Sequence, residues 1–240
     1  MMKGHALLFS LLFLAAGLKA QLWLEIGGKA NYGLTGYYNK NIINDRQHDF
    51  SLNGGLAYGG VIGLNIGDYH GFNIEGLKAT SQQKLSYRDL LADIDNVLQW
   101  ETFDLYFLYR YYSESGAYFE IGPKLSKVKL VEQTLEKSLS DVKDLYEDQY
   151  LSAALGLGGF LAGTDIFTLK LGIRLEYAFQ DFVNEAGMDS GQPAPYTSYS
   201  SYTPTHPVRA TIGIELNFGV GGVAQASCGR RRLMFGTRYR

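Results

Sequence analysis

Three histidines beyond the first twenty residues are the side chains best suited to acid–base or metal chemistry. His48 is followed closely by Asp49 and Ser51, which are the residue types of a Ser–His–carboxylate triad for ester hydrolysis, whereas His70 and His206 stand elsewhere in the chain. A triad needs its base held between a nucleophile and a third group, and neighbours on one polar segment do not provide that geometry. The three histidines also lack metal-ligand spacing. We therefore expect no catalytic residue, no metal site and no cofactor.

A second set of chemically capable residues is charged and recurs at alternate positions of otherwise apolar segments. The set is Glu25, Lys29, Glu120, Lys124, Lys170, Arg174, Glu176, Arg209 and Glu215. Such side chains can pair with one another across a narrow interior, or they can line an ion path. In a barrel of about eight strands the side chains nearly fill the interior, which favours a salt-bridged plug over an ion path or a wide pore.

The segments that carry these charges alternate with a period of two. Between residues 167 and 177, and again between 208 and 218, every second residue is apolar and the positions between them are polar or glycine. A strand sends such alternate residues to opposite faces, whereas a helix would scatter them around its axis. Segment 71–87 loses the phase near Leu77, where we expect a bulge, and 97–112 is aromatic at both parities, so its faces stay unassigned. The eight candidate strands are 22–35, 52–66, 71–87, 97–112, 119–126, 149–162, 167–177 and 208–218.

The connections between these strands alternate strictly between short and long. The short ones are 67–71, 113–116 and 163–165, and the long ones are 37–50, 88–96, 131–148 and 181–207. Outer-membrane barrels have short periplasmic turns and long extracellular loops. The sequence therefore predicts an all-β fold, an eight-stranded antiparallel up-and-down transmembrane β-barrel, with both mature termini in the periplasm.

Alternation alone does not say which face meets lipid. A lipocalin-like soluble barrel would place the apolar parity inside, but here the polar parity is rich in glycine as well as charge, which suits the crowded lumen of a small barrel. Aromatic residues near the strand ends are typical of interfacial girdles. They include Tyr32, Tyr58, Tyr109, Tyr111, Tyr177 and Phe218. The membrane interpretation is favoured, and a soluble periplasmic ligand-binding barrel stays open as an alternative.

The chain divides into three parts. Residues 1–20 have a basic start, an apolar centre and a small residue at the end, which is the pattern of a cleaved signal peptide; the barrel would occupy 21–220. Residues 221–240 form a tail without acidic residues whose arginines are Arg230, Arg231, Arg232, Arg238 and Arg240, beside the only cysteine, Cys228. On this topology the tail lies in the periplasm, where it would either dock an anionic partner or lipid headgroups or stay unstructured.

Two long loops have patterns of their own. In 131–148, Leu135, Leu139, Val142 and Leu145 recur at helical intervals, which predicts a short amphipathic helix on an outer loop. Loop 181–207 is rich in tyrosine and serine, a composition that suits adaptable contact surfaces and equally an unstructured loop.

Several segments resemble the PorT-like outer-membrane β-barrel family of Bacteroidetes-type bacteria, a family of small porin-like barrels. The segments are FNIEGLKATSQQKL (72–85), LQWETFDLYFLYRYY (98–112), AYFEIGPKL (117–125) and LKLGIRLEYAFQDF (169–182). The chain departs from the family where it reads Glu101-Thr102-Phe103 in place of Glu-Ile-Pro. The resemblance implies an eight-stranded barrel, and some family members belong to the type IX secretion and gliding machinery.

Three functional hypotheses follow. The first is a non-enzymatic outer-membrane barrel that serves as an assembly or anchoring component, with outer-membrane lipid and other envelope or secretion-system proteins as its partners. The second is a small transport channel, and the third is the soluble periplasmic barrel. An exported protein does not meet nucleic acid, so that partner class is excluded.

Overall fold

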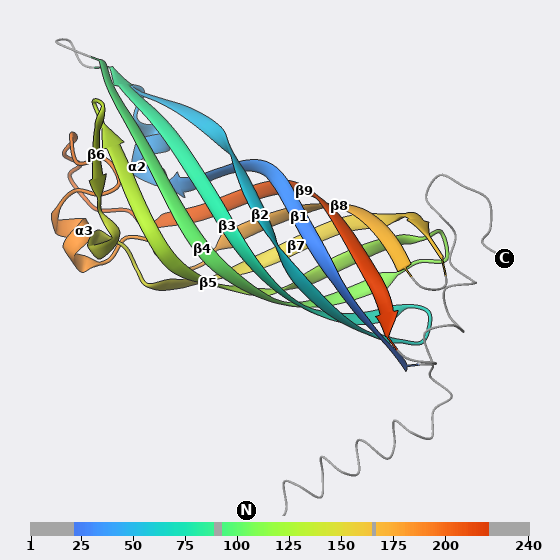
Figure 1. Cartoon of the computed structure of the whole chain (residues 1–240). Coiled ribbons are helices and arrows are strands. Elements are labelled where there is room, and N and C mark those ends of the chain that lie inside the picture. The colour runs from blue at the N-terminus through green and yellow to red at the C-terminus, as the bar shows by residue number, and fades with distance from the viewer. Residues whose placement is uncertain (1–21, 89–92, 165–166, 221–240) are drawn as a thin grey trace, which may run out of the picture.

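Eight long antiparallel strands pair side by side and close on themselves (Figure 1). The computed structural model describes residues 22–88, 93–164 and 167–220. The long strands are β1 (Leu22–Asn39), β2 (His48–Ile66), β3 (His70–Arg88), β4 (Asp93–Tyr112), β5 (Ala117–Leu135), β7 (Gln149–Gly163), β8 (Phe167–Ala178) and β9 (Thr205–Val220). The smaller elements are α2 (Lys40–Asn44), β6 (Ser138–Asp141), the 3-10 helix η1 (Lys143–Leu145) and α3 (Glu185–Asp189). None of the helices within these ranges is long and apolar enough to cross a membrane.

The ring follows the order of the chain. Its order is β1–β2–β3–β4–β5–β7–β8–β9, and the pairing of β9 with β1, from Val220 opposite Leu24 to Thr205 opposite Asn39, closes it. The short β6 lies outside the ring, because it is the second arm of a hairpin at the end of β5. A closed ring has no edge of unpaired backbone groups, which is the condition for a sheet to stand in hydrocarbon. The expected eight-stranded antiparallel barrel is confirmed.

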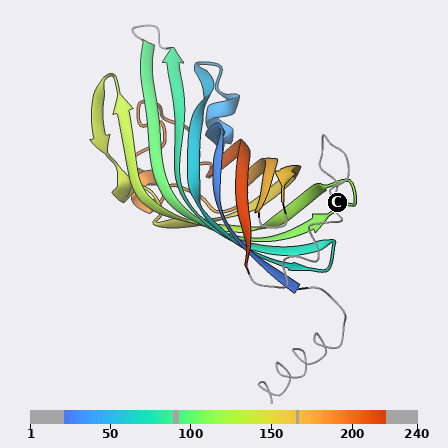
Figure 2. The same ribbon diagram turned by 45° about the vertical axis from the view of Figure 1, so that its right-hand side comes forward.

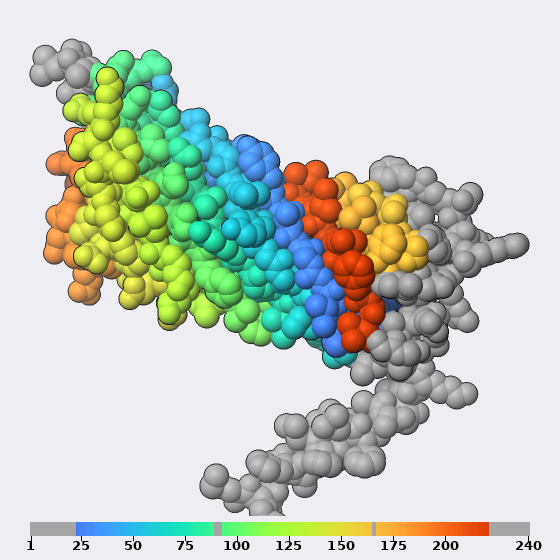
Figure 3. Space-filling model, viewed as in Figure 1, coloured from blue at the N-terminus to red at the C-terminus, as the bar shows by residue number. Residues whose placement is uncertain are grey.

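The two ends of the barrel differ in what they carry. The tight turns after β2 and β4 lie at the end where β1 begins and β9 ends, whereas α2, β6, η1 and α3 lie at the opposite end (Figure 1). We call these four elements, the segment 179–204 and the strand ends that hold them the head. The space-filling view shows the strands as a continuous surface between the head and the turn-bearing end (Figure 3).

The strands are of unequal length, and the difference builds the head. β2, β3 and β5 have 19 residues each and β4 has 20, whereas β7 has 15 and β8 has 12. The longer strands rise past the others as a curved wall (Figure 2). Leu85, Leu98, Trp100 and Val131 cover the inner side of this wall and are buried. The head therefore has an apolar core of its own.

The helix predicted around Leu139 and Leu145 is wrong. β5 runs on to Leu135, turns through Glu136 and Lys137 at φ 46° and 75°, and returns as β6 before the short η1. Left-handed backbone at both central residues is the two-residue hairpin turn that matches the twist of the strands. A Glu-Lys pair lacks the glycine or asparagine that usually marks such a turn, so the sequence shows only an apolar spacing that suits a helix.

The bulge predicted near Leu77 is also wrong. β3 pairs with β4 in one register from His70 to Arg88, and Leu77 points inward and is fully buried. The register shifts elsewhere, in β2 between Leu52 and Ala57 and between β4 and β5 beside Thr102. Beyond the second shift the buried residues of β5 change from even to odd positions. That bulge re-aims β5 as it enters the head.

Candidate functional site

The outer face of the barrel is an apolar belt. The large apolar side chains exposed on it include Ile26, Tyr32, Leu34, Leu56, Tyr58, Ile62, Leu64, Phe72, Ile74, Phe103, Phe107, Ile121, Leu155, Leu157, Ile173, Leu175, Ile212, Ile214 and Phe218. On β8 the outward residues run from Phe167 to Tyr177. At about 3.3 Å per residue and a tilt of about 40° this span rises about 25 Å, which is the height of the apolar band of a membrane barrel.

On the wall the belt ends before the strands do. On β3 and β4 it stops at Lys78 and Glu101, whose side chains form an exposed ion pair of 3.0 Å. Beyond this pair the outward residues of the wall are largely polar and include Gln82, Lys84 and Asp95. The wall therefore changes from a lipid-compatible surface to a water-compatible one along the same strands.

Within the part of the chain that the structure describes, twelve charged side chains are buried inside the barrel. The acidic ones are Glu25, Glu75, Asp104, Glu120, Glu176 and Glu215, and the basic ones are Lys29, Arg110, Lys124, Lys170, Arg174 and Arg209. Six negative charges thus face six positive charges, and the set is neutral as a whole. All nine residues of the charged set singled out in the sequence lie here, and the structure brings them into two contacting groups.

The larger group lies toward the turn-bearing end, and two arginines connect it. Arg174 donates to both oxygens of Glu75 at 2.7 and 2.9 Å and to Glu120 at 2.8 Å. Arg110 donates to Glu120 at 2.7 Å and to both oxygens of Glu215 at 2.9 Å. Bidentate pairs of this kind are the strongest charge-assisted hydrogen bonds in proteins.

Two lysines complete this group. Lys29 lies 2.9 Å from Glu75 and 3.3 Å from Glu215, and Lys170 donates to Glu25 at 2.8 Å. Lys29 and Glu215 stand opposite each other on the neighbouring strands β1 and β9, whereas the pairs Lys29–Glu75 and Lys170–Glu25 each join strands that have one other strand between them. Each carboxylate therefore meets at least one cation, as burial of charge requires.

The smaller group lies nearer the head. Lys124 donates to Glu176 at 2.6 Å, and Arg209 donates to Asp104 at 3.0 Å. The hydroxyl of Tyr106 donates to Glu176 at 2.9 Å, and its ring lies 4.8 Å from the Arg174 guanidinium. Tyr106 therefore joins the two groups into one interior network.

Aromatic side chains close the lumen at the turn-bearing end. Tyr112, Tyr118 and Phe160 form a buried cluster with ring centroids 5.7 and 5.9 Å from Tyr112. The Arg110 guanidinium stacks 4.4 Å from the Tyr118 ring, which connects this cluster to the charges above it. Gly158 is needed beneath the same ring, because a Cβ at that position would stand 2.4 Å from it.

Phe182 closes the lumen from the head. It belongs to the segment 179–204 and is fully buried, with its ring centroid 4.7 Å from Tyr146, 5.5 Å from Trp100 and 5.5 Å from Tyr150. Its backbone N–H donates to the Thr205 carbonyl at 2.8 Å, which fixes the insertion. The lumen is thus filled at three levels, by aromatic residues at each end and by ion pairs between them.

Three members of the network were missing from the sequence set. Glu75 has the inward parity of β3, but the loss of alternation near Leu77 hides that parity in the sequence. Asp104 and Arg110 lie on β4, where aromatic residues occupy both faces. The signal that would have found them is the polar residues of that strand, since Thr102, Asp104 and Arg110 all have the parity that faces inward.

His48 lies in the head, and its carboxylate partner is Asp45, whereas Asp49 and Ser51 are the triad residue types that follow it in the sequence. Its Nδ1 is 3.0 Å from an Asp45 oxygen and its Nε2 is 3.2 Å from the Tyr196 hydroxyl. The Tyr199 hydroxyl donates to the same Asp45 carboxylate at 3.1 Å, and the Tyr87 ring packs 4.9 Å from the imidazole. These contacts hold segment 179–204 against β2 and β3.

Electrostatics and geometry assign this histidine a structural contact. Burial lowers the pKa of His48 below its ordinary 6.5, and the Asp45 carboxylate offsets part of that shift. Asp49 instead pairs with Arg88. His70 bonds the Tyr109 hydroxyl at the opposite end of the barrel. Among residues 22–88, 93–164 and 167–220, no group of three or more His, Cys, Asp and Glu side chains is placed to hold a metal ion.

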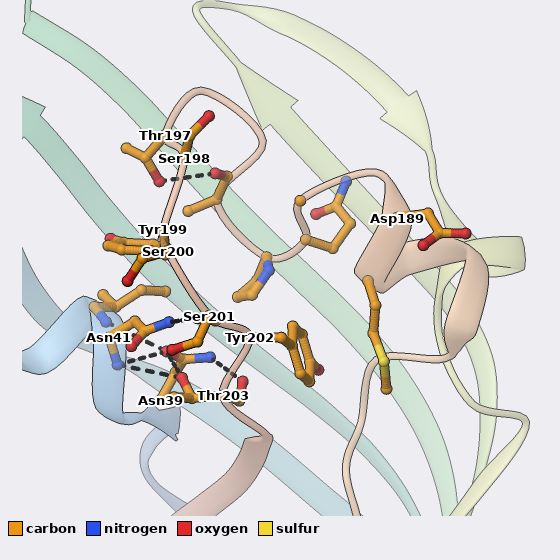
Figure 4. Close-up of a pocket in the computed structure, with 16 residues that line it drawn as sticks. Asn39, Asn41, Asp189, Thr197, Ser198, Tyr199, Ser200, Ser201, Tyr202 and Thr203 are labelled. Carbon is orange, nitrogen blue, oxygen red and sulfur yellow. Dashed lines mark hydrogen bonds between the residues drawn. The ribbon is translucent and has the colours of Figure 1, made fainter.

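A polar cavity of about 320 Å³ opens in the head between α2 and the segment 188–203 (Figure 4). Asn39 and Asn41 lie on its α2 side, residues 197–203 run along another side, and Asp189 of α3 lies opposite (Figure 4). For this tyrosine- and serine-rich segment the sequence left open an adaptable contact surface or an unstructured loop, and it did not predict a cavity.

An apolar exterior, a charged interior and a closed ring together define the transmembrane β-barrel class. The solved structures similar to the chain include the outer membrane protein OprG from Pseudomonas aeruginosa, with 12% identity, 86% of this chain and 99% of that chain covered, and a TM-score of 0.44. Neisserial surface protein A has 13% identity, coverage of 80% and 95%, and a TM-score of 0.38. The Ail protein of Yersinia pestis has 10% identity, coverage of 82% and 98%, and a TM-score of 0.36. No protein-family model matches the chain, and no curated protein matches it.

The predicted signal peptide, residues 1–20, and the basic tail, residues 221–240, lie outside the described residues. The five tail arginines and Cys228 therefore stay as predicted from the sequence.

Proposed function

We propose that this protein is an exported outer-membrane β-barrel that works as a non-enzymatic anchor for its head on the outside of the cell. The observation that carries the proposal is the filled lumen, in which Phe182, the twelve-charge network and the Tyr112 cluster occupy successive levels. Because its interior is packed, the barrel has only its head, its ends and its lipid-facing surface available to bind partners or ligands. Export through the signal peptide predicted for residues 1–20, and periplasmic termini, are part of this proposal.

The polarity of the barrel supports lipid as the neighbour of its outer face. A soluble ligand-binding barrel needs apolar residues inside and polar ones outside, and here outward Ile212 and Ile214 alternate with inward Thr211 and Glu215. Bacterial barrels with this polarity belong to the outer membrane. The purified protein is expected in the detergent-soluble membrane fraction, with heat-modifiable migration in gels. Recovery of the folded protein from the aqueous fraction would refute the membrane location.

Bilayer recordings separate an anchor from a transport channel. The full-length protein, reconstituted into planar phospholipid bilayers, is expected to give no unitary conductance in symmetrical potassium chloride. An established porin in parallel bilayers serves as the positive control, and heat-modifiability verifies the fold of the reconstituted sample. Regular conductance steps would show that ions pass the network and would favour the channel.

A finer form of the proposal concerns partners. The resemblance to the PorT-like family suggests an assembly role in type IX secretion or gliding, and the tail arginines Arg230, Arg231, Arg232, Arg238 and Arg240 would dock an anionic envelope partner by charge attraction. Purification from membranes in mild detergent, with and without residues 221–240, tests both ideas. Secretion-system proteins that are recovered only with the full chain would support them. An identical set of proteins after deletion would refute the docking role of the tail.

A further inference from the structure

The cavity in the head is built by long-range contacts that join its two sides. The Asn39 amide donates to the Thr203 carbonyl and to the Thr205 hydroxyl, both at 2.9 Å, while its oxygen caps the first turn of α2. The Asn41 amide donates to the Ser201 carbonyl at 2.7 Å. Figure 4 shows the bonds of Asn39 and Asn41 to the segment 201–203. The site is therefore preformed, which limits the ordering cost of binding a ligand.

The tyrosines of the cavity are held by bonds to residues outside it. The Tyr202 hydroxyl donates to Asp181 at 2.6 Å, and the Tyr199 hydroxyl donates to Asp45 at 3.1 Å. Each ring is about two-fifths exposed. Hydroxyls fixed in this way leave the ring as the available surface, and an aromatic ring offers a rigid apolar face at low entropic cost.

The charges of the lining restrict the ligand. Asp189 is its single ionisable carboxylate, and no lysine, arginine or histidine of the described residues lines it. An anion such as a phosphate or a sulfate would therefore meet no counter-charge. A hydrocarbon ligand is excluded as well, because the lining is dominated by side-chain hydroxyls and amides.

The remaining polar groups favour a neutral ligand with many hydroxyls. Ser198, Ser200 and Ser201 present hydroxyls that bond no other described residue, so each can both donate to and accept from a ligand. The volume of about 320 Å³ lies at the lower end of the range for small-molecule sites. A saccharide matches this combination, because its hydroxyls exchange hydrogen bonds in both directions while its C–H faces pack on aromatic rings.

We propose that this cavity, between α2 and the segment 188–203, binds a neutral saccharide. The inference deepens the proposed function and rests on it for the location of the head outside the cell, where glycans are met. It gives the anchored head a ligand class that the fold alone does not assign.

Saturation-transfer difference NMR tests the proposal on the full-length protein in phospholipid nanodiscs. Maltoside and glucoside detergents are avoided, because their headgroups would compete for the cavity. The probes are the methyl glycosides of glucose, galactose, mannose and N-acetylglucosamine, with a phosphorylated hexose and choline as charged comparators. At least one neutral glycoside is expected to bind at least about tenfold more tightly than either charged probe.

Variants place the binding in the cavity. Ser201→Tyr fills the cavity from a residue whose side chain bonds no other described residue, and it is expected to weaken binding by at least about tenfold. Ser198→Tyr fills the same space from a second position and guards against a local distortion of the first. Ser138→Tyr, on the exposed β6 outside the cavity, is the matched control and should bind as the parent does.

Three results would overturn the inference: no transfer to any of the four glycosides from heat-modifiable protein, unchanged binding in both filled variants, or preferred binding of choline that Asp189→Asn abolishes. Conductance and fractionation, which test the proposed function, do not involve the cavity. A conducting barrel that binds the glycoside would refute the anchor and leave this inference standing, and a silent barrel that binds no glycoside would do the reverse.

Discussion

Replacement of Arg174 by methionine removes the cation that bridges Glu75 and Glu120 in the lumen. Its guanidinium bonds both carboxylates within 2.9 Å, and all three side chains are at most 4% exposed. The interior charge changes from neutral to minus one, and the lost hydrogen bonds leave carboxylates facing Lys29 and Arg110 alone. Removal of one partner from a buried ion pair costs about 3–5 kcal/mol, against a total stability of about 5–15 kcal/mol for ordinary domains.

Urea unfolding in phospholipid vesicles, followed by tryptophan fluorescence, measures this loss. Lys78→Met on the outer wall is the matched control, because its pair with Glu101 is 52% and 26% exposed and is worth at most about 1 kcal/mol. The double variant Arg174→Met with Glu75→Gln restores neutrality and is expected to recover part of the loss. If Arg174→Met costs no more than Lys78→Met, the lumen is hydrated and the reasoning about buried charge fails.

Three further changes test other parts of the molecule. Gly59→Ala places a Cβ 2.0 Å from the Gly76 carbonyl oxygen and is expected to destabilise the protein by about 1–3 kcal/mol in the same assay. Gly60→Ala, whose Cβ would lie 3.9 Å from its nearest neighbour, should change stability by less than about 0.5 kcal/mol, and equal effects of the two variants would contradict the close packing at Gly59. Burial lowers the pKa of His48, so this site stabilises the head above pH 6.5 and loses that contribution as the pH falls through the lowered value. Hydrogen exchange in segment 190–204, corrected for intrinsic rates, should therefore rise on acidification. The same rise in the His48→Gln variant would refute this cause. Phe182→Ala should cost about 3–5 kcal/mol and still give no conductance, because the ion network remains; channel openings would show that the aromatic cap alone seals the lumen.

The strands could be predicted wherever the two faces differ in polarity. β8 and β9 have apolar residues outward and polar ones inward at nearly every position, so their period of two is unambiguous. β4 resists the same reasoning, because Trp100 and Tyr106 fill the interior while Phe103 and Phe107 face outward. Aromatic residues serve both the packed lumen and the lipid-facing surface, and composition cannot tell these positions apart.

The contacts across the barrel could not be predicted from alternation. The parity rule places Arg174 and Glu120 inside, but which acid meets which base depends on the tilt and stagger of the closed ring. The cavity is less accessible still, because it depends on Asn39 bonding Thr203, 164 residues away in sequence. Local patterns carry no information on that contact.

The interior ion pairs join residues that lie far apart in the sequence and are therefore synthesised at different times. Lys170 bonds Glu25 across 145 residues of sequence, and Arg110 bonds Glu215 across 105. A partly assembled sheet would therefore hold several lone charges at its open seam, with hydrocarbon beside them. Insertion of this barrel should consequently be an all-or-none event, in which the first and last strands must meet before the interior becomes electrically balanced.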